Sequence, residues 1–284
     1  MSAKLKKGSI GRARGRAAVK NDGTDSEPPI PPPFDVVVEG YQRALFLDHF
    51  LEAGRTPAIS DLEIAVCFAD LRGFTRYVDS LQSNSQDSRV HELIGSYFQI
   101  YPKAILETVY ALEPRPNEQI TARDEKIRKA IVPSMFKTLG DGMMLVWELG
   151  GSREIQDQVS GRILQVVATI RRLFKNLIEE RVESAAIPYS KAIANLELGI
   201  GLARGRAWRL DFGRGRPLDY AGTIVNVAAR LQDLARPEGI VAEVGFCDQV
   251  FRAPKINGQQ KQVVLKGIVK PVDVWASPEV KLDF

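Results

Sequence analysis

Runs of apolar residues with two different periods divide the chain into predicted strands and helices. The run from Glu63 to Ala69 is almost continuously apolar, as expected of a buried strand, and residues 196–203 repeat that pattern. Elsewhere apolar residues recur every three to four positions, which predicts amphipathic helices over residues 89–112, 153–183 and 224–235. Pro102 is expected to kink or break the first of these helices.

The clearest hairpin signal is the turn sequence Gly140-Asp141-Gly142 between two apolar runs, residues 134–139 and 143–149. Two more strands are expected around Gln262–Leu265 and Val272–Trp275. Strands that alternate with helices and hairpins predict an α+β fold, in which helices cover a mostly antiparallel sheet.

The composition separates a long globular body from an N-terminal tail. Residues 1–33 are basic and then rich in Gly, Asp, Ser and Pro, so they are predicted to be a disordered tail. Residues 34–59 are expected to form a helical lead-in, and residues 60–284 the main domain. The polar stretch over residues 113–133 is expected to project from that domain as an insertion.

The formal net charge of +4 at pH 7 comes from the tail. Residues 1–20 hold seven of the 39 Lys and Arg residues and no acid, which leaves 32 bases against 35 acids in the rest of the chain. A slightly acidic body argues against a nucleic-acid partner. No stretch approaches the roughly 18 consecutive apolar residues that span a bilayer, so a cytoplasmic protein without membrane contact is expected.

Histidine and cysteine are too scarce for several kinds of active site. The chain has two His and two Cys residues. This argues against a His-ligated zinc centre and against a Ser-His-Asp hydrolase, which needs an imidazole base beside its nucleophile. Cys67 and Cys247 lie far apart in the sequence, as expected of reduced thiols. Any metal chemistry is therefore expected to depend on carboxylates.

Two aspartates stand at the ends of apolar strands. Asp70 follows Cys67-Phe68-Ala69, and Asp141 occupies the turn of the predicted hairpin. Carboxylates on neighbouring strand ends suit Mg²⁺, which binds few carboxylates and takes its other ligands from water and phosphate oxygens. Taken singly, each residue also fits a plain structural role, a loop cap for Asp70 and a turn for Asp141.

Three sequence strings in a fixed order add weight to the metal-binding interpretation. Phe68–Thr75, Lys137–Asp141 and Val225–Leu231 together resemble the class III adenylate/guanylate cyclase catalytic domain, over about residues 60–276. The resemblance implies a homodimer of ferredoxin-like, palm-type domains. It also implies conversion of a nucleoside triphosphate into a 3′,5′-cyclic nucleotide and pyrophosphate with two Mg²⁺ or Mn²⁺ ions per active site.

The resemblance assigns a role to each matching residue. Asp70 and Asp141 become the metal ligands, with the backbone carbonyl of Leu71 as an additional ligand. Asn226 orients the ribose and Arg230 stabilises the transition state; their spacing of four places them on one helix face. In this family the metal carboxylates come from one subunit, and the Asn and Arg from the other. A monomer is therefore predicted to be inactive.

Lys137 and Asp219, which is expected in a turn over residues 219–223, match the spacing of the base-reading Lys and Asp of adenylate cyclases. One donor and one acceptor suit adenine and cytosine, and also uracil in a shifted pose. Guanine fits as well, although guanylate cyclases usually carry other residues at these positions. The segment around Lys266 resembles one that places a lysine near the triphosphate, although a solvated lysine fits equally well.

The architecture favours UTP over ATP. A cyclase domain without a recognisable sensor is similar to the bacterial pyrimidine cyclases of anti-phage signalling, whose cyclic UMP or CMP activates a separate effector protein. ATP is the alternative substrate, and a catalytically silent nucleotide-binding or dimerisation module is the alternative of another class.

Overall fold

The computed structural model describes residues 58–81, 88–113, 121–184, 187–211, 218–246 and 257–282. All of them belong to a single compact unit, Arg55–Phe284. The predicted tail of residues 1–33, nearly all of the predicted lead-in and Cys247 lie outside the described residues. Their predicted structures therefore stay predictions.

Eight strands form one sheet in the described part of the chain. Their order is β2-β3-β1-β4-β6-β8-β7, and β5 pairs with β4 beside this path. The β4–β6 pair is parallel and the other pairs are antiparallel. The strands are β1 (Ala58–Arg72), β2 (Met135–Leu139), β3 (Gly142–Glu148), β4 (Glu197–Asp211), β5 (Asp219–Ala221), β6 (Gly239–Glu243), β7 (Gln259–Val263) and β8 (Val272–Ala276).

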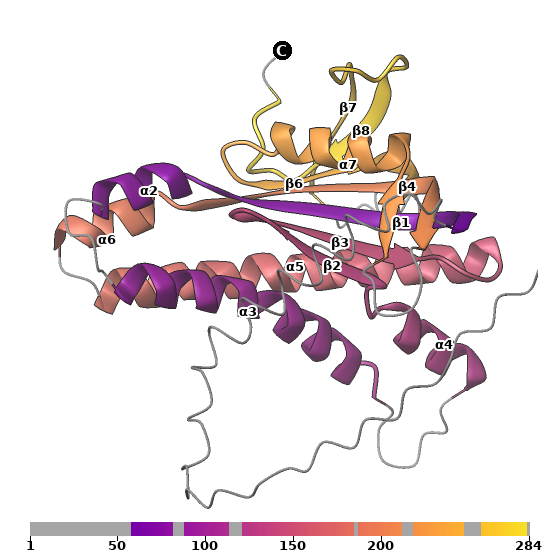
Figure 1. Ribbon diagram of the computed structural model, residues 1–284, viewed down its shortest axis with the longest axis horizontal. Helices are drawn as coiled ribbons and strands as arrows, with labels where there is room; N and C mark the ends of the chain where they lie inside the picture. The colour runs from indigo at the N-terminus through magenta and orange to yellow at the C-terminus, as the bar shows by residue number, and fades with distance from the viewer. Residues whose placement is uncertain are drawn as a thin grey trace, which may run out of the picture. The chain divides into compact units, whose positions relative to one another are not determined.

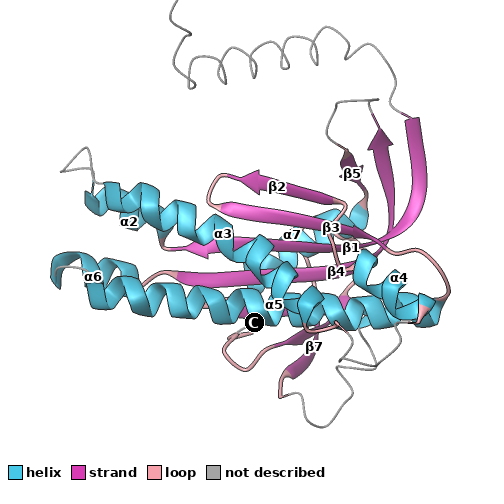
Figure 2. Ribbon diagram, turned by 90° about the horizontal axis from the view of Figure 1, so that it is seen from below, coloured by secondary structure: helices cyan, strands magenta, loops and turns pink. Residues whose placement is uncertain are grey.

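Helices lie on both faces of this sheet. Figure 1 shows α3 and α5 on one side and α7 on the other, and Figure 2 shows α3 and α5 side by side across the strands. This arrangement confirms the predicted α+β fold with a mostly antiparallel sheet. The helices are α2 (Phe74–Leu81), α3 (Ser88–Tyr110), α4 (Ala122–Ala130), α5 (Arg153–Ser184), α6 (Ile187–Ala194), α7 (Thr223–Leu234) and the 3₁₀ turn Val244–Phe246.

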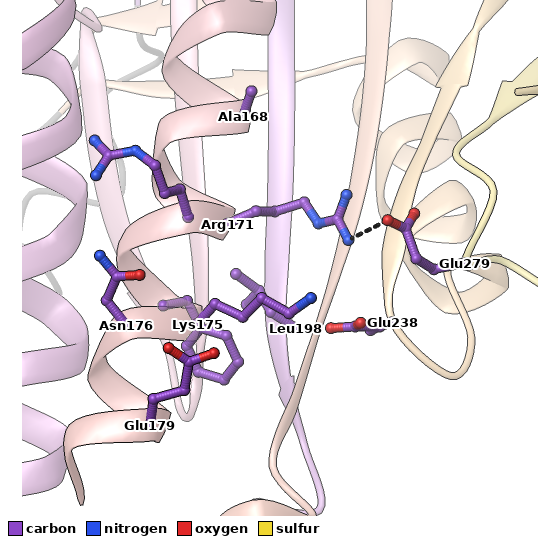
Figure 3. A pocket seen from close by; sticks show the side chains of 10 residues that line it. Ala168, Arg171, Lys175, Asn176, Glu179, Leu198, Glu238 and Glu279 are labelled. Atoms are coloured by element: carbon purple, nitrogen blue, oxygen red, sulfur yellow. Dashed lines mark ion pairs between the residues drawn. The ribbon is translucent and has the colours of Figure 1, made fainter. Parts of the chain in front are cut away.

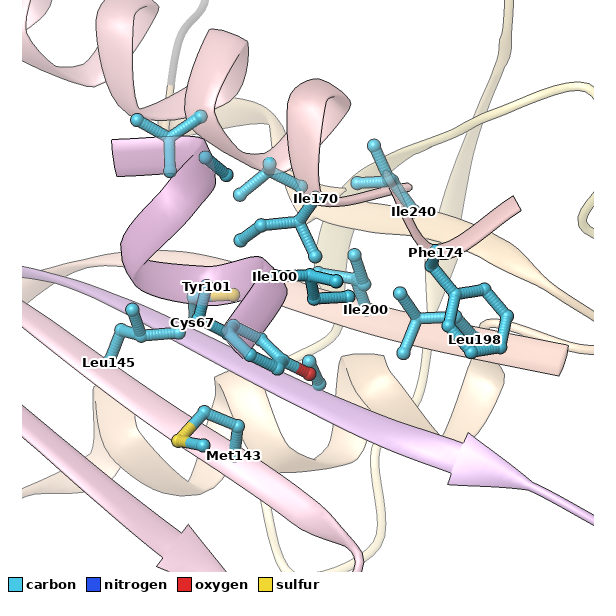
Figure 4. Packing of buried hydrophobic residues seen from close by; sticks show 14 of the residues in the cluster. Cys67, Ile100, Tyr101, Met143, Leu145, Ile170, Phe174, Leu198, Ile200 and Ile240 are labelled. Carbon is cyan, nitrogen blue, oxygen red and sulfur yellow. The ribbon is translucent and has the colours of Figure 1, made fainter. Parts of the chain in front are cut away.

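The side chains of β1 alternate between two apolar cores. The core on the α3/α5 side, drawn in Figure 4, takes Cys67 and its neighbours at every second position of β1. The core on the α7 side takes Ile64 and Val66, with Phe68 packed against it. Successive strand residues point to opposite faces, so the next residues on the α7 side are Asp70 and Arg72. We call these the α5 face and the α7 face of the sheet.

Two central strands are longer than the sequence pattern predicts. β1 and β4 have 15 residues each and pair along their whole length, from Ala58 opposite Asp211 to Arg72 opposite Glu197. The second half of β4 carries Arg204 and Arg206, whose charges hide the strand period. Strand β6 and helix α6 were not predicted, because both segments are too short for a clear period.

Three local predictions need correction. Helix α3 continues through Pro102, so the break, one of the two expected outcomes, does not occur. This residue is exposed, so water can reach the carbonyl of the preceding turn that proline leaves without a helical partner. Asp219 begins the short strand β5 instead of a turn, because it pairs with Leu210 of β4. The expected insertion contains helix α4, which a reciprocal capping box between Thr121 and Asp124 begins.

A buried arginine joins the sheet to the start of α5. Arg204 is 1% exposed, and its guanidinium lies 2.6 Å from Asp157 and 3.3 Å from Glu63. It also donates to Gln156 and Ser160. Because the whole guanidinium has partners, its burial is tolerated. Arg204 therefore links β4 to the start of α5 and to β1 on the α5 face of the sheet.

None of the helices in the described ranges is both long and apolar enough to cross a bilayer.

Candidate active site

Asp70 lies at the C-terminal end of β1, on the α7 face. Its two cross-strand neighbours are glycines, Gly142 on β3 and Gly199 on β4. No side chain therefore stands on either side of the Asp70 carboxylate in the plane of the sheet. A Cβ added at Gly142 would lie 3.4 Å from Asp70 Oδ1 and 3.1 Å from the carbonyl oxygen of Ala69. Gly142 therefore leaves room for the Asp70 carboxylate, and a Cβ at Gly199 would lie 3.1 and 3.2 Å from two nitrogens of the Arg72 guanidinium.

Asp141 lies in the turn between β2 and β3, one residue before Gly142. The turn requires Gly140, which has a positive φ of 69°. Partial burial raises the pKa of Asp141 above its ordinary value, and the negative charge of Asp70 raises it further. The hairpin register therefore brings the two aspartates together, and their mutual repulsion favours a cation between them.

Within the protein, a guanidinium partly neutralises this pair. Arg72 Nη1 lies 3.2 Å from Asp70 Oδ2. Its positive charge also opposes the rise in the pKa of Asp141. Arg72 was part of the sequence string that carried the family resemblance, yet no role was predicted for it.

The backbone carbonyl of Leu71 is the third expected ligand. The pairing of β1 with β3 ends at Asp70 and Gly142, whereas the pairing with β4 continues through Leu71. Carbonyls of alternate strand residues point the same way, and that of Ala69 lies against Gly142. The Leu71 carbonyl should therefore point past the end of β3, toward the Asp141 turn. Its side chain is buried on the α5 face.

These residues fit a divalent cation bound together with phosphate. No group of three or more His, Cys, Asp and Glu residues suited to a metal occurs in the described part of the chain. Two carboxylates and one carbonyl, with the Asp70 side chain 32% exposed, suit hard cations that take their remaining ligands from water and phosphate oxygens. We therefore consider Asp70, Asp141 and Leu71 together as the candidate metal site.

Lys137 and Asp219 are brought together although 82 residues separate them. Lys137 Nζ on β2 lies 3.3 Å from Asp219 Oδ2 on β5, and both side chains are almost half exposed. The other carboxylate oxygen of Asp219 accepts a hydrogen bond from the Tyr220 amide. The Tyr220 hydroxyl in turn donates to Glu148 at 2.7 Å. The expected base-reading residues thus form an accessible donor–acceptor pair.

Asn226 and Arg230 lie on the outer side of α7. Both are exposed, whereas Val227, Ala228 and Leu231 face the sheet. This confirms that the two residues share a helix face. Within the described structure, the ion pair of Arg230 is with Asp233 on the same helix, at 3.3 Å.

Asn226 and Asp70 do not meet within one protomer. Helix α7 runs along β4, with Ile224 nearest Gly205 and Ala235 nearest Gly199. Asp70 pairs with Gly199, and Asn226 belongs to the first turns, more than about 10 Å away along the strand at roughly 3.3 Å per residue.

Lys266 lies in the turn after β7, at the far edge of the sheet, and is exposed. Four strand spacings separate β7 from β1, or about 19 Å. Lys266 is therefore not part of the group around Asp70 in the same protomer.

A pocket elsewhere on the surface does not involve the expected site residues. It lies beside α5, and Figure 3 shows the Arg171–Glu279 ion pair, at 3.2 Å, across one side of it. Lys175 and Glu238 also line it.

Comparison with solved structures identifies the fold. The adenylyl cyclase CyaB from P. aeruginosa superposes with a TM-score of 0.56 and 19% identity, over 80% of this chain and 99% of that one. A bacterial light-regulated adenylyl cyclase gives a TM-score of 0.52 and 18% identity, over 78% and 93% of the two chains. This protein has the adenylyl cyclase fold. No protein-family model matches the sequence, and no curated protein matches it significantly.

Three contributors to the site in this adenylyl cyclase fold were not predicted. Gly199 and Gly142 flank Asp70, and Arg72 pairs with it. A glycine inside an apolar strand, as Gly199 is, and a glycine in a hairpin turn, as Gly142 is, are both visible in the sequence. Their position beside Asp70 depends on the strand register, which one sequence does not reveal.

Proposed function

We propose that this protein is a nucleotidyl cyclase that converts a nucleoside triphosphate into a 3′,5′-cyclic nucleotide and pyrophosphate at a site shared by two protomers. The observation that carries the proposal is the Asp70–Asp141 pair at the open end of β1, between two glycine neighbours. The adenylyl cyclase fold, found in structural neighbours that carry that name, supports it.

In the proposed reaction the 3′-oxygen forms a bond to the α-phosphorus while the bond from that phosphorus to the bridging oxygen breaks. The 3′-hydroxyl gives its proton to solvent water, and pyrophosphate leaves with the bridging oxygen. Two Mg²⁺ or Mn²⁺ ions, when bound, would supply charge neutralisation for the triphosphate and lower the pKa of the 3′-hydroxyl. Asp70, Asp141 and the Leu71 carbonyl would hold them.

Arg230 and Asn226 would act on the α-phosphate and the ribose. A guanidinium stays charged and presents a fixed set of donors, so Arg230 can stabilise the charge that develops on the non-bridging oxygens. Its partner Asp233 is on the same exposed helix surface, and exposed pairs of this kind are weak, about 0–1 kcal/mol. A bound triphosphate can therefore displace Asp233 at little cost. Lys266 is proposed only as an additional phosphate contact.

Within one protomer the metal-binding carboxylates lie far from Asn226, and this separation favours a site shared by two protomers. Asp70 lies over the end of α7, whereas Asn226 lies on its outer surface near the start. A two-fold homodimer can bring the carboxylates of one chain to the α7 surface of its mate and so form two equivalent sites.

For the base, we propose uracil, with adenine as the alternative. Lys137 offers a donor and Asp219 an acceptor, 3.3 Å apart and accessible to solvent. A base edge with one acceptor and one donor can replace their mutual contact. The proposed cyclic nucleotide would act as a second messenger read by a separate effector, in the manner of anti-phage signalling.

The direct test incubates the purified protein with Mn²⁺ and each of the four ribonucleoside triphosphates. Cyclic product and an equal amount of pyrophosphate are expected, most rapidly from UTP. Faster turnover of ATP would replace the proposed base. A folded dimer that turns over none of the four would instead support the silent nucleotide-binding module.

Mixed dimers test the shared site. Asp70→Ala and Arg230→Ala are each expected to reduce kcat by about 100-fold or more, as does the loss of other preorganised charge stabilisers. Random mixing of the two variants places one intact site in half of the dimers, so about a quarter of the wild-type activity should return. Failure of that recovery with properly folded, dimeric variants would contradict a shared site.

A further inference from the structure

Arg72 links the candidate metal site to the helix that carries Arg230. One guanidinium nitrogen, Nη1, lies 3.2 Å from Asp70 Oδ2, and the other, Nη2, donates to the backbone carbonyl of Gln232 at 2.6 Å. Gln232 belongs to the last turn of α7. Arg72 is only 15% exposed, so its position is fixed by these contacts more than that of a surface arginine.

Gly199 makes this connection possible. It pairs with Asp70, and a Cβ there would lie 3.1 Å from Arg72 Nε, 3.2 Å from Nη2 and 2.9 Å from the carbonyl oxygen of Ala235. The guanidinium therefore passes directly over a residue without a side chain to reach the end of α7. This explains why β4 has glycine at that position.

The contact at α7 is a C-terminal cap. The last carbonyls of a helix lack the usual partner four residues on and carry the negative end of the helix dipole, so a cation that binds one of them stabilises that end. The Gln232 carbonyl accepts a hydrogen bond from the Ala235 amide at 3.1 Å, and Arg72 adds a charged donor to it. Arg72 thus has two anionic partners, the Asp70 carboxylate and the end of α7.

We infer that Arg72 is a positioning residue that couples the two shared active sites of the dimer. This inference rests on the proposed function. Each protomer would give Asp70 to one site and Arg230 to the other, and Arg72 connects these two contributions within one chain. A divalent cation at Asp70 would neutralise that carboxylate and repel the guanidinium, which would then have the α7 end as its one remaining anionic partner and would hold the Arg230 helix of the second site in place.

The first test measures this link without catalysis. Hydrogen exchange is followed in a peptide covering residues 228–236, in the metal-free protein and with millimolar Mn²⁺. Exchange should slow about two- to fivefold with Mn²⁺, which corresponds to a stronger cation contact at a helix end. In Arg72→Lys this effect should disappear, because a lysine has one compact head group and does not bridge both partners.

Arg206→Lys is the matched control. Arg206 also forms a two-nitrogen pair, with Asp61 at 3.1 and 2.6 Å, but it is 73% exposed and does not contact α7 or Asp70 in the described structure. It should keep the wild-type response to Mn²⁺. Equal responses in the wild type and Arg72→Lys would overturn the inference, as would a wild type that binds Mn²⁺ without a change in this peptide.

The second test uses dimers with a single working site. One chain carries Arg230→Ala and supplies the metal carboxylates of the working site. The other chain is otherwise wild type and supplies Asn226 and Arg230; its own carboxylates can still bind Mn²⁺, but they face the Arg230→Ala position of the first chain and so form the inactive site. The mixed dimers are isolated with a different affinity tag on each chain. Arg72→Lys is then added to the second chain, whose Asp70 is intact but does not serve the working site. The kcat of that site should fall about two- to fivefold with little change in KM.

The Arg72 coupling and the proposed cyclase activity can fail independently of each other. An unchanged kcat in this dimer would overturn the coupling while the cyclase activity itself stands. Absence of turnover by the wild-type protein would instead refute the proposed function, and the hydrogen-exchange result would still decide whether Arg72 connects Asp70 to α7.

Discussion

Substitution of Gly201 by alanine should displace α7 and so reduce both stability and catalysis. Gly201 lies under the middle of α7, where an added Cβ would be 2.2 Å from both the Ala228 carbonyl oxygen and the Gln232 amide nitrogen. Ordinary contacts of a Cβ begin near 3.4 Å. Since both obstructing atoms are backbone, no side-chain rotation relieves the clash, and α7 has to move away by about 1 Å.

Two magnitudes follow for Gly201→Ala. Overpacking of a core typically costs about 1–3 kcal/mol, and a clash with backbone belongs at the upper end. A displacement of about 1 Å in a group that contacts the reacting atoms can reduce the rate about 100-fold. Urea unfolding measures the first effect. The kcat, measured at a temperature where the variant is fully folded, gives the second.

Gly95→Ala is the control for this experiment. Gly95 lies within α3, and nothing stands within 4 Å of a Cβ built there. Alanine should therefore stabilise the protein, by about 0.5–1 kcal/mol, through its higher helix propensity, and leave kcat unchanged. Wild-type stability and kcat in Gly201→Ala would refute the close packing of α7 on β4.

Three further outcomes are expected. In the metal-free protein, Asp141→Asn should raise the melting temperature at pH 7, because burial and Asp70 raise the pKa of this carboxyl and so penalise its charged form. The gain in melting temperature should vanish in acid, where the wild-type carboxyl is protonated. The variant should also lose the stabilisation that Mn²⁺ gives the wild type. Arg204→Ala should lower the free energy of unfolding in urea by about 3–5 kcal/mol, because it removes the buried partner of Glu63 and leaves Asp157 with only the exposed Arg153. Arg206→Ala, at an exposed site, should cost less than about 1 kcal/mol. Lys137→Met should raise the KM for the preferred nucleotide about 10- to 100-fold through the loss of one charged hydrogen bond, with little change in melting temperature because its pair with Asp219 is exposed.

The sequence pattern predicted the elements whose period is long or strong. Helix α5 was predicted at residues 153–183 and is found at Arg153–Ser184, because nine of its residues face the core at regular spacing. The β2–β3 hairpin was also predicted, from the turn sequence Gly140-Asp141-Gly142. In the structure Gly140 follows β2 with a positive φ, which explains why glycine stands there. These signals are local, so a single sequence is enough to find them.

The features that depend on register could not be predicted in the same way. β7 is found at Gln259–Val263 instead of around residues 262–265, because its first four residues are polar and exposed. The pairing of Lys137 with Asp219 joins the edge strand β2 to β5. The family resemblance implied that both residues read one base, but no hydrophobic period near either residue indicates their direct contact. The proximity of Asp70 and Asp141 could be suspected from the resemblance, but the glycines beside them follow only from the strand pairing.

The alternation along β1 places the Asp70 carboxylate at the end of a strand that otherwise builds the core. Ile64 and Val66 are fully buried on the α7 face, and Phe68 packs against the same core. Two residues later the sheet offers only glycines as neighbours, so Asp70 on that face meets solvent and Arg72 instead of apolar side chains. A carboxylate in this position is held by 15 residues of paired strand and keeps an accessible side. Rigid support with one open side is what binding a cation and a phosphate together requires.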